Sequence, residues 1–332
     1  MPFKPPFWSP SQAEAILFDW DGIIAETHLD FSALHEKYYG KKRAMLLEDS
    51  VHLAPSERKS LMRDLEETEI RGASEATLVP GASDVIAWTE RNKIPWAVVS
   101  RNCRKSILLA AEKTSFKLPP IVRSRDDGDC VKPDPRALVE TCRALGADPV
   151  QTLLIGDYIY DMMGARRAGM RGALVRERIE PDWDQWLEFS CGSMTSLRSE
   201  LDSPGETVAW EYRELADTHG AGFLRKAASI TALVPADDSA GTDIWTAKAA
   251  SLGIGAFAVP DVPFSPRSWR ANTSFEPGCM GASLADAIRS FLRVRFPLAS
   301  VEPFSGRESC TELPRDPDEI EGFLLSRVKR DG

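Results

Sequence analysis

The stretch "AILFDWDGIIAE", residues 15–26, decides the fold because it joins a buried strand to two carboxylates. Ala15 to Phe18 form an unbroken apolar run, which is typical of a strand covered on both faces in a parallel α/β sheet. Asp19 and Asp21 follow at once, with one tryptophan between them. Two carboxylates this close repel each other and lose hydration, so they need a cation, a shifted protonation state, or both. The stretch therefore predicts a metal site or a proton-transfer site at a strand end.

Between residues 81 and 175 the pattern alternates between helix and strand. Two stretches have apolar residues at helical spacing, and a third helix is expected to open near Asp161 and close at Gly169. The first two contain Val85, Ile86 and Trp88, and then Leu138, Val139, Cys142 and Leu145 with Gly146 as the stop. Strands are expected over 96–99, 153–155 and 173–175. This alternation predicts an α/β fold with a doubly wound parallel sheet.

Polar side chains follow three of the expected strands directly. Asp19, Ser100 and Asp157 each come at a strand end. Because ligands of such sheets lie outside the carboxyl ends of the strands, we expect these side chains to meet at one edge. Lys132 lies in "CVKPDP", whose prolines indicate a loop that leads into a helix.

The length of the chain predicts two domains. Its 332 residues exceed the roughly 100 to 200 residues of one domain. We expect a first domain over 1–204, with its core in 13–27 and 79–200 and a small helical cap over 28–78 that covers the site. The cap is interrupted at Gly40 and Pro55, and Ser56 is expected to be the N-cap of its second helix. Residues 205–332 are expected to form a second, smaller α/β domain after a linker at 203–205.

The second domain carries no recognised motif. Its strands "ITALVP" and "GAFAVP" lead to Asp237, Asp238 and Asp261, at the expected carboxyl edge of a small parallel sheet. We expect this domain to pack against the first one or against a second copy of the chain, which would make a homo-oligomer. A ligand-sensing module is the alternative.

Composition excludes several classes of partner. The net charge of −9 argues against nucleic acid and anionic membranes. No apolar run approaches the roughly 20 residues that span a bilayer, and the proline-rich start lacks the apolar segment of a secretory signal. The 6 cysteines are scattered without a CxxC pair, as suits reduced thiols. These features predict a cytoplasmic protein.

The residue types at the expected sheet edge suit phosphoryl transfer with Mg²⁺. This ion takes oxygen ligands and keeps several waters, so Asp19 and Asp157 suffice together with a substrate phosphate. Asp19 can attack phosphorus to form an aspartyl phosphate, and Asp21 can act as the general acid and base. Ser100 can donate a hydrogen bond to the phosphoryl group, and Lys132 can place a positive charge on it. Asp161, one turn after Asp157, can orient the metal or its waters.

The set "FDWDG", "VVSRN", "VKPDP" and "IGDYIYD", in this order, resembles the four motifs of the haloacid dehalogenase-like superfamily, particularly its phosphoglycolate phosphatase-like branch with a helical cap. The likeness spans about residues 14–178. It implies that Asp19 is the nucleophile and a metal ligand, and that Asp21 is the acid and base and gives a backbone carbonyl to the metal. Ile23 stands where the family usually has Thr or Val. The family's serine, lysine and acidic pair correspond to Ser100, Lys132, Asp157 and Asp161.

The leading hypothesis is a magnesium-dependent phosphatase that hydrolyses a small phosphorylated metabolite through an aspartyl phosphate. Arg101 and Asn102, which follow the motif serine, are candidates for substrate contact. A phosphosugar mutase or another phosphotransferase is the alternative reaction, and the short cap argues more against the mutase than against a phosphatase. A non-catalytic metabolite sensor or scaffold is the alternative from a different class. The expected metal ligands are Asp19, Asp21, Asp157 and Asp161.

Overall fold

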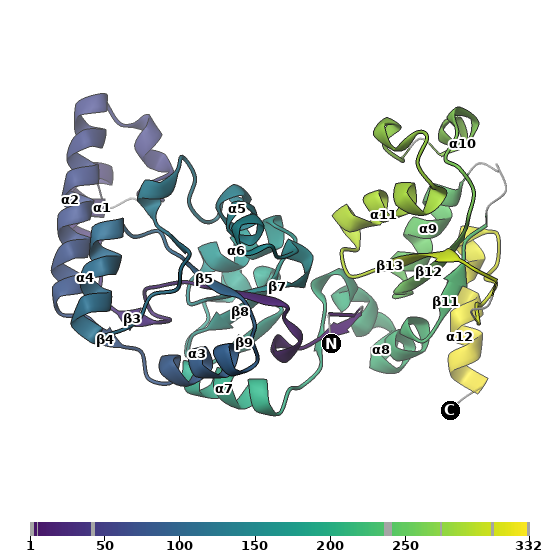
Figure 1. Ribbon diagram of the computed structural model, residues 1–332, viewed down its shortest axis with the longest axis horizontal. Coiled ribbons are helices and arrows are strands. Elements are labelled where there is room, and N and C mark those ends of the chain that lie inside the picture. Colours follow the sequence, from purple (N-terminus) through teal and green to yellow (C-terminus); the bar gives the residue numbers. More distant parts are fainter. Residues whose placement is uncertain are drawn as a thin grey trace. The chain divides into compact units, whose positions relative to one another are not determined.

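The computed structural model describes residues 3, 4, 6–40, 44–235, 241–272, 274–306 and 309–330 (Figure 1). The chain forms two compact units, Ala13–Pro204 and, as the other, Met1–Gln12 together with Gly205–Gly332. None of the helices in the described ranges is long and apolar enough to cross a membrane.

A six-stranded parallel sheet forms the centre of the unit Ala13–Pro204 (Figure 1). Next to one another lie β6 (Val122–Arg123), β5 (Trp96–Val99), β2 (Ala15–Phe18), β7 (Thr152–Gly156), β8 (Arg171–Val175) and β9 (Phe189–Cys191). Phe18 pairs with Val98 on one side and with Ile155 on the other, so β2 is a central strand. Every residue of β2 and β7 is buried, which explains their continuous apolar sequences.

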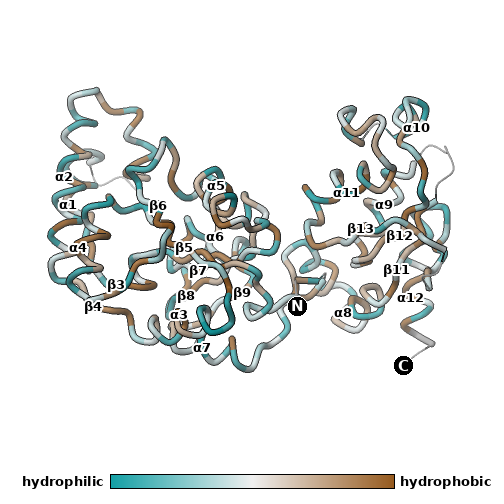
Figure 2. Tube along the Cα trace, viewed as in Figure 1, coloured by the Kyte–Doolittle hydropathy of each residue, from teal (hydrophilic) through white to brown (hydrophobic). Residues whose placement is uncertain are grey.

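Helices cover both faces of this sheet, which confirms the predicted doubly wound α/β fold (Figure 1). On one face lie α5 (Pro135–Leu145) and α6 (Ile159–Arg167), and on the other α3 (Ala82–Arg91) and α7 (Met194–Asp202). Brown, hydrophobic segments follow the central strands in Figure 2. One core cluster joins strands to α5 and α6 through Leu17, Ala97, Val99, Leu138, Cys142, Leu154, Ala165 and Met170.

A helical insertion separates the first strand from the rest of the sheet. Its base is a short antiparallel pair, β3 (Ala25–Glu26) with β4 (Thr77–Leu78). Between them lie α1 (Ser32–Tyr39), the 3-10 helix η2 (Asp49–His52) and α2 (Pro55–Ser74), and α2 packs against α4 (Arg104–Thr114). The insertion has its own small core of Leu34, Leu46, Leu61 and Leu65.

The N-cap of α2 is Ala54, not Ser56 as the sequence suggested. Pro55 occupies the first helical position, because a proline has no N–H to satisfy and its fixed φ suits that place. Ser56 therefore lies inside the first turn, and the helix begins two residues earlier than expected.

The second unit contains a parallel sheet in the order β11 (Thr231–Leu233), β12 (Ala256–Pro260) and β13 (Ser300–Phe304). Its helices are α8 (Arg213–Ala228), α9 (Thr242–Ser251), α10 (Pro266–Ala271), α11 (Leu284–Arg295) and α12 (Ile320–Arg330). The strands predicted over "ITALVP" and "GAFAVP" correspond to β11 and β12. Asp261 follows β12, whereas Asp237 and Asp238 lie outside the described residues.

The first twelve residues belong to the second unit, which differs from the expected first domain over 1–204. The reason is an antiparallel pair between β1 (Phe7–Trp8) and β10 (Thr207–Val208), in which the Trp8 side chain is buried. The described residues also form short 3-10 helices: η1 (Pro10–Gln12), η3 (Arg125–Asp127), η4 (Pro149–Gln151), η5 (Pro181–Trp186), η6 (Trp210–Tyr212), η7 (Pro277–Cys279) and η8 (Pro317–Glu319).

Candidate active site

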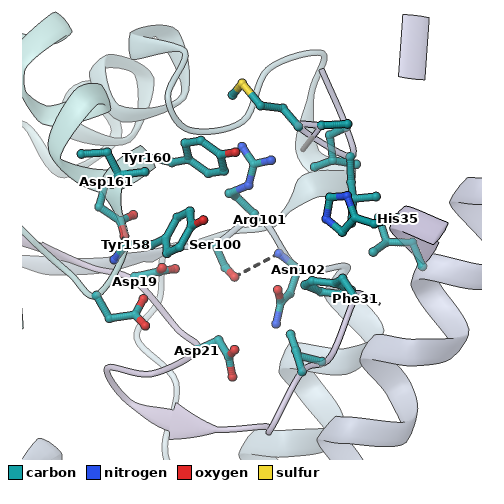
Figure 3. A pocket seen from close by; sticks show the side chains of 18 of the residues that line it. Asp19, Asp21, Phe31, His35, Ser100, Arg101, Asn102, Tyr158, Tyr160 and Asp161 are labelled. Carbon is teal, nitrogen blue, oxygen red and sulfur yellow. Dashed lines mark hydrogen bonds between the residues drawn. The ribbon is translucent and has the colours of Figure 1, made fainter. Parts of the chain in front are cut away.

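The carboxyl edge of the six-stranded sheet opens into a cavity of about 1000 Å³ within the unit Ala13–Pro204. Asp19 after β2, Ser100 after β5 and Asp157 after β7 all line it. Parallel strands bring these ends together, as the sequence predicted. The helical insertion supplies another part of the wall, including Phe31 and His35 (Figure 3).

Three carboxylates gather at this edge. Asp19, Asp157 and Asp161 each bring one oxygen to within 4.8 Å of the others. The buried ammonium of Lys132 lies 2.8 Å from Asp19 Oδ1 and 2.6 Å from Asp161 Oδ1. Although burial disfavours the charged form of Lys132, the charges of Asp161 and Asp19 outweigh it and raise the pKa of this lysine. The ammonium of Lys132 is therefore held between two of the acids, and the Arg176 guanidinium lies 3.9 Å from the third, Asp157.

The positive charge near these acids does not keep their pKa values low. Burial, with the negative charge of Asp161, raises the pKa of Asp19 to about 7. Burial, with the charge of Asp19, raises the pKa of Asp157 to about 8. A divalent cation would relieve both effects, and a set of carboxylate oxygens is the kind of site that Mg²⁺ prefers. The residues present therefore fit the predicted metal.

Asp21 lies in the same cavity but has a separate partner. Its Oδ1 accepts hydrogen bonds from the backbone N–H of Thr27, at 3.0 Å, and from the Thr27 hydroxyl. Burial raises the pKa of Asp21 to about 6, and the bonds from Thr27 limit that rise. The hydroxyl and the amide together fix the orientation of this carboxylate.

Two glycines make room for the acids. Gly22 has φ +73°, and a Cβ there would lie 2.5 Å from Asp157 Oδ2. A Cβ on Gly156 would overlap the carboxylate of Asp161. Only a residue without a side chain fits these close approaches.

Ser100 and its two neighbours form the loop after β5. Ser100 is 4% exposed, and its Oγ accepts a hydrogen bond of 3.1 Å from the Asn102 backbone N–H (Figure 3). Asn102 is also buried and lines the cavity. The Arg101 guanidinium instead forms a two-point pair with Glu48 of the insertion, at 2.7 and 3.0 Å, and lies over the Tyr160 ring. Arg101 thus already has an anionic partner in the protein.

Several cavity residues were not singled out from the sequence. Arg176 follows β8, and its Nη1 lies 3.3 Å from the backbone oxygen of Asp157. Its guanidinium also lies over the rings of Tyr158 and Trp183, which form an aromatic part of the wall. The strand-end argument that selected Asp19 would have selected Arg176 as well. Thr27 had no such signal, because its role depends on how the base of the insertion folds.

Comparison with known proteins gives a consistent result for the first unit. Residues 13–169 match the family model for haloacid dehalogenase-like hydrolases. N-acetylmuramic acid 6-phosphate phosphatase of Pseudomonas aeruginosa is 29% identical over 192 residues, which are 49% of this chain and 81% of that protein. Phosphoglycolate phosphatase 1 of the same species is 24% identical and covers 51% of this chain and 72% of its own. Pyrophosphatase PpaX of Halalkalibacterium halodurans is 26% identical, with coverages of 49% and 84%.

A solved structure supports the fold. A hydrolase from Pseudomonas syringae superposes with a TM-score of 0.50 at 18% identity, over 57% of this chain and 99% of that one. At this level of identity the likeness concerns the fold alone.

Proposed function

Residues 13–169 of this chain belong to the haloacid dehalogenase-like hydrolases, and from that premise we propose that the protein is a phosphatase that hydrolyses a small phosphomonoester with Mg²⁺ through an aspartyl phosphate. The phosphatases among its relatives support the reaction class. One observation carries the proposal: three carboxylates lie within 4.8 Å of one another beside the buried ammonium of Lys132.

In this proposal Asp19 is the nucleophile. Its Oδ1 accepts hydrogen bonds from the Trp20 backbone N–H, at 2.7 Å, and pairs with Lys132 at 2.8 Å. These contacts fix the carboxylate and leave Oδ2 to attack phosphorus. The P–O bond to the leaving alcohol breaks as the bond from Asp19 to phosphorus forms.

Asp21 is the proposed acid and base. It gives its proton to the leaving alcohol oxygen and then takes a proton from the water that hydrolyses the aspartyl phosphate. The pKa of about 6 suits a group that must do both near neutral pH, and the bonds from Thr27 keep the carboxylate in one orientation.

The remaining residues hold the phosphoryl group and the metal. Ser100 and Asn102 line the cavity, where Ser100 would bond to a phosphoryl oxygen and Asn102 would contact the substrate. Lys132, held between Asp19 and Asp161, would add positive charge next to the phosphoryl oxygens. Bound Mg²⁺ supplies positive charge to the phosphate and to the acids around it. The proposed metal set is Asp19, Asp157, Asp161 and the backbone carbonyl of Asp21.

Hydrolysis of p-nitrophenyl phosphate tests the proposal. We expect turnover with Mg²⁺, none after treatment with EDTA, and none from an Asp19→Asn variant, because an amide cannot form the acyl phosphate. Absence of turnover in a metabolite screen as well, with the wild type and Asp19→Asn behaving alike, would contradict it. In that screen, free phosphate identifies a phosphatase, and an isomeric phosphate ester identifies a mutase.

A further inference from the structure

A buried ion pair joins the helical insertion to the loop beside the catalytic cavity. Glu69, near the end of α2, is 2% exposed, and Arg125, at the start of η3, is 8% exposed at the side chain. Arg125 Nη2 donates to Glu69 Oε2 at 3.0 Å, and Nη1 donates to Oε1. Both residues line the cavity. Buried charges of this kind need a full set of partners, so each further contact of the pair matters.

The remaining contacts of the pair all reach the loop after β5. Glu69 Oε2 also accepts the backbone N–H of Cys103 at 2.9 Å. Arg125 Nη1 donates to the backbone oxygen of Arg101 at 3.1 Å. The backbone N–H of Arg125 donates to the Asn102 oxygen at 3.0 Å. Two consecutive peptide groups, 101–102 and 102–103, are therefore held at three polar atoms by one carboxylate and the arginine that it orients.

This loop carries the proposed phosphate ligand. Ser100 lies at its start, and Ser100 Oγ accepts the Asn102 N–H, so a shift of residues 101–103 would move the hydroxyl. The metal set lies elsewhere, after β2 and β7 and in α6. The contacts of Glu69 thus act on the phosphate side of the site and not on the metal side.

We propose that Glu69 is a positioning residue that, through Arg125 and the Cys103 N–H, holds the loop of Ser100 in the conformation that binds phosphate. The proposal rests on the phosphatase function above. It assigns to the insertion a part in shaping the phosphate site in addition to covering it.

The test is Glu69→Gln. The carboxylate accepts three bonds, one at Oε1 and two at Oε2, whereas an amide has one oxygen. In either orientation the amide NH₂ faces an N–H of Arg125, so at least one arm of the two-point pair must break. We expect the KM for p-nitrophenyl phosphate and the inhibition constant of inorganic phosphate to rise at least about tenfold. The Mg²⁺ concentration for half-maximal activity should stay within about twofold.

Two matched controls use the same change of Glu to Gln. Glu66 is three residues earlier on α2 and pairs with Lys105 of α4 at 2.6 Å on the surface. Glu66→Gln should leave all three constants unchanged. Glu48 pairs with the Arg101 side chain and not with the loop backbone, so Glu48→Gln should raise the inhibition constant of phosphate less than Glu69→Gln does.

Arg125→Lys gives a second route if Glu69→Gln does not fold, as judged by circular dichroism. Lysine keeps the charge but not the two-point geometry. We therefore again expect the KM and the phosphate inhibition constant to rise while the Mg²⁺ concentration for half-maximal activity stays the same. Equal losses for phosphate and Mg²⁺ would overturn the proposal, since they indicate general loosening. A raised KM with an unchanged inhibition constant of inorganic phosphate would also overturn it, because Glu69 would then affect binding of the leaving group and not of the phosphate.

The outcome for the wild type separates the two proposals. One outcome is that the wild type turns over p-nitrophenyl phosphate while Glu69→Gln has the same KM and the same phosphate inhibition constant. That result rejects the positioning role and leaves the phosphatase function intact. If the wild type has no turnover, the phosphatase function fails, and the positioning role, which rests on it, falls with it.

Discussion

At the scale of single residues, the proposed acid and base depends on one threonine. The Thr27 hydroxyl and N–H both bond to Asp21 Oδ1. Thr27→Val keeps the shape and removes one donor, so the carboxylate gains rotational freedom and its pKa rises further. We expect kcat to fall about tenfold, less than the roughly 10²- to 10⁴-fold that general acid–base catalysis contributes, because Asp21 itself remains, with KM little changed. Thr27→Ser keeps the hydroxyl and serves as the control, and a normal kcat in Thr27→Val would show that the bond is dispensable.

A second prediction at this scale concerns the metal. Asp157→Asn removes one of three clustered carboxylates, so we expect Mg²⁺ no longer to raise the Tm of this variant. In the wild type, Mg²⁺ at about 100 times its Kd should stabilise the fold by about 2.7 kcal/mol. Without metal, the variant should melt above the wild type, because repulsion between buried acids is reduced.

Asp182→Asn is the control for the metal prediction. Asp182 lines the same cavity but is not part of the acidic cluster, so this variant should keep the response to Mg²⁺. Differential scanning calorimetry, with Mg²⁺ and with EDTA, measures the Tm of both variants and of the wild type. An equal Mg²⁺ response in Asp157→Asn and the wild type would remove Asp157 from the metal set.

At the scale of elements, the pairing of α1 with α2 should depend on pH. Hydrogen bonds from Lys37 and Tyr38 of α1 lower the pKa of Asp64 in α2 from 3.8 to about 2. The folded-state pKa is depressed, so this stabilisation is present above about pH 4 and is lost as pH falls toward 2. We expect Asp64→Asn to lower the free energy of unfolding by about 1 kcal/mol at pH 7.

Urea unfolding between pH 7 and pH 3 measures this effect. The difference between Asp64→Asn and the wild type should narrow below pH 4. Glu67→Gln, one turn on and 70% exposed at the side chain, should change stability by less than about 0.5 kcal/mol. A difference that is constant with pH would rule out the carboxylate charge as its source.

At the scale of the whole molecule, the two units should be separable in function. All the proposed site residues and the partners described for them lie in Ala13–Pro204. We therefore expect a fragment of residues 13–204 to hydrolyse p-nitrophenyl phosphate with kcat and KM within about twofold of the full chain.

The same fragment tests the role of the second unit. Loss of a dimer or of solubility would support the packing role predicted for the second unit, and loss of a metabolite's effect on rate would support the sensor. Loss of catalysis in a folded fragment would contradict the prediction.

Four strands of the central sheet and most helices of the first unit were predictable because their signals are local. Continuous apolar runs marked β2, β5 and β7, and helical spacing with a glycine stop marked α5. The helix α4 was missed although it packs on α2. Its sequence, Arg104–Thr114, has few long apolar residues, so its amphipathic pattern is weak.

The sequence by itself determined the α/β fold and the convergence of Asp19, Ser100 and Asp157, because parallel strands in such a sheet present their carboxyl ends at one edge. It also determined which acids and which lysine were candidates for the chemistry. Only the tertiary structure decided that Glu48 and Glu69 of the insertion pair with Arg101 and Arg125. Those partners are more than fifty positions apart, and no periodic pattern encodes a contact between side chains that meet only when the insertion folds back over the sheet.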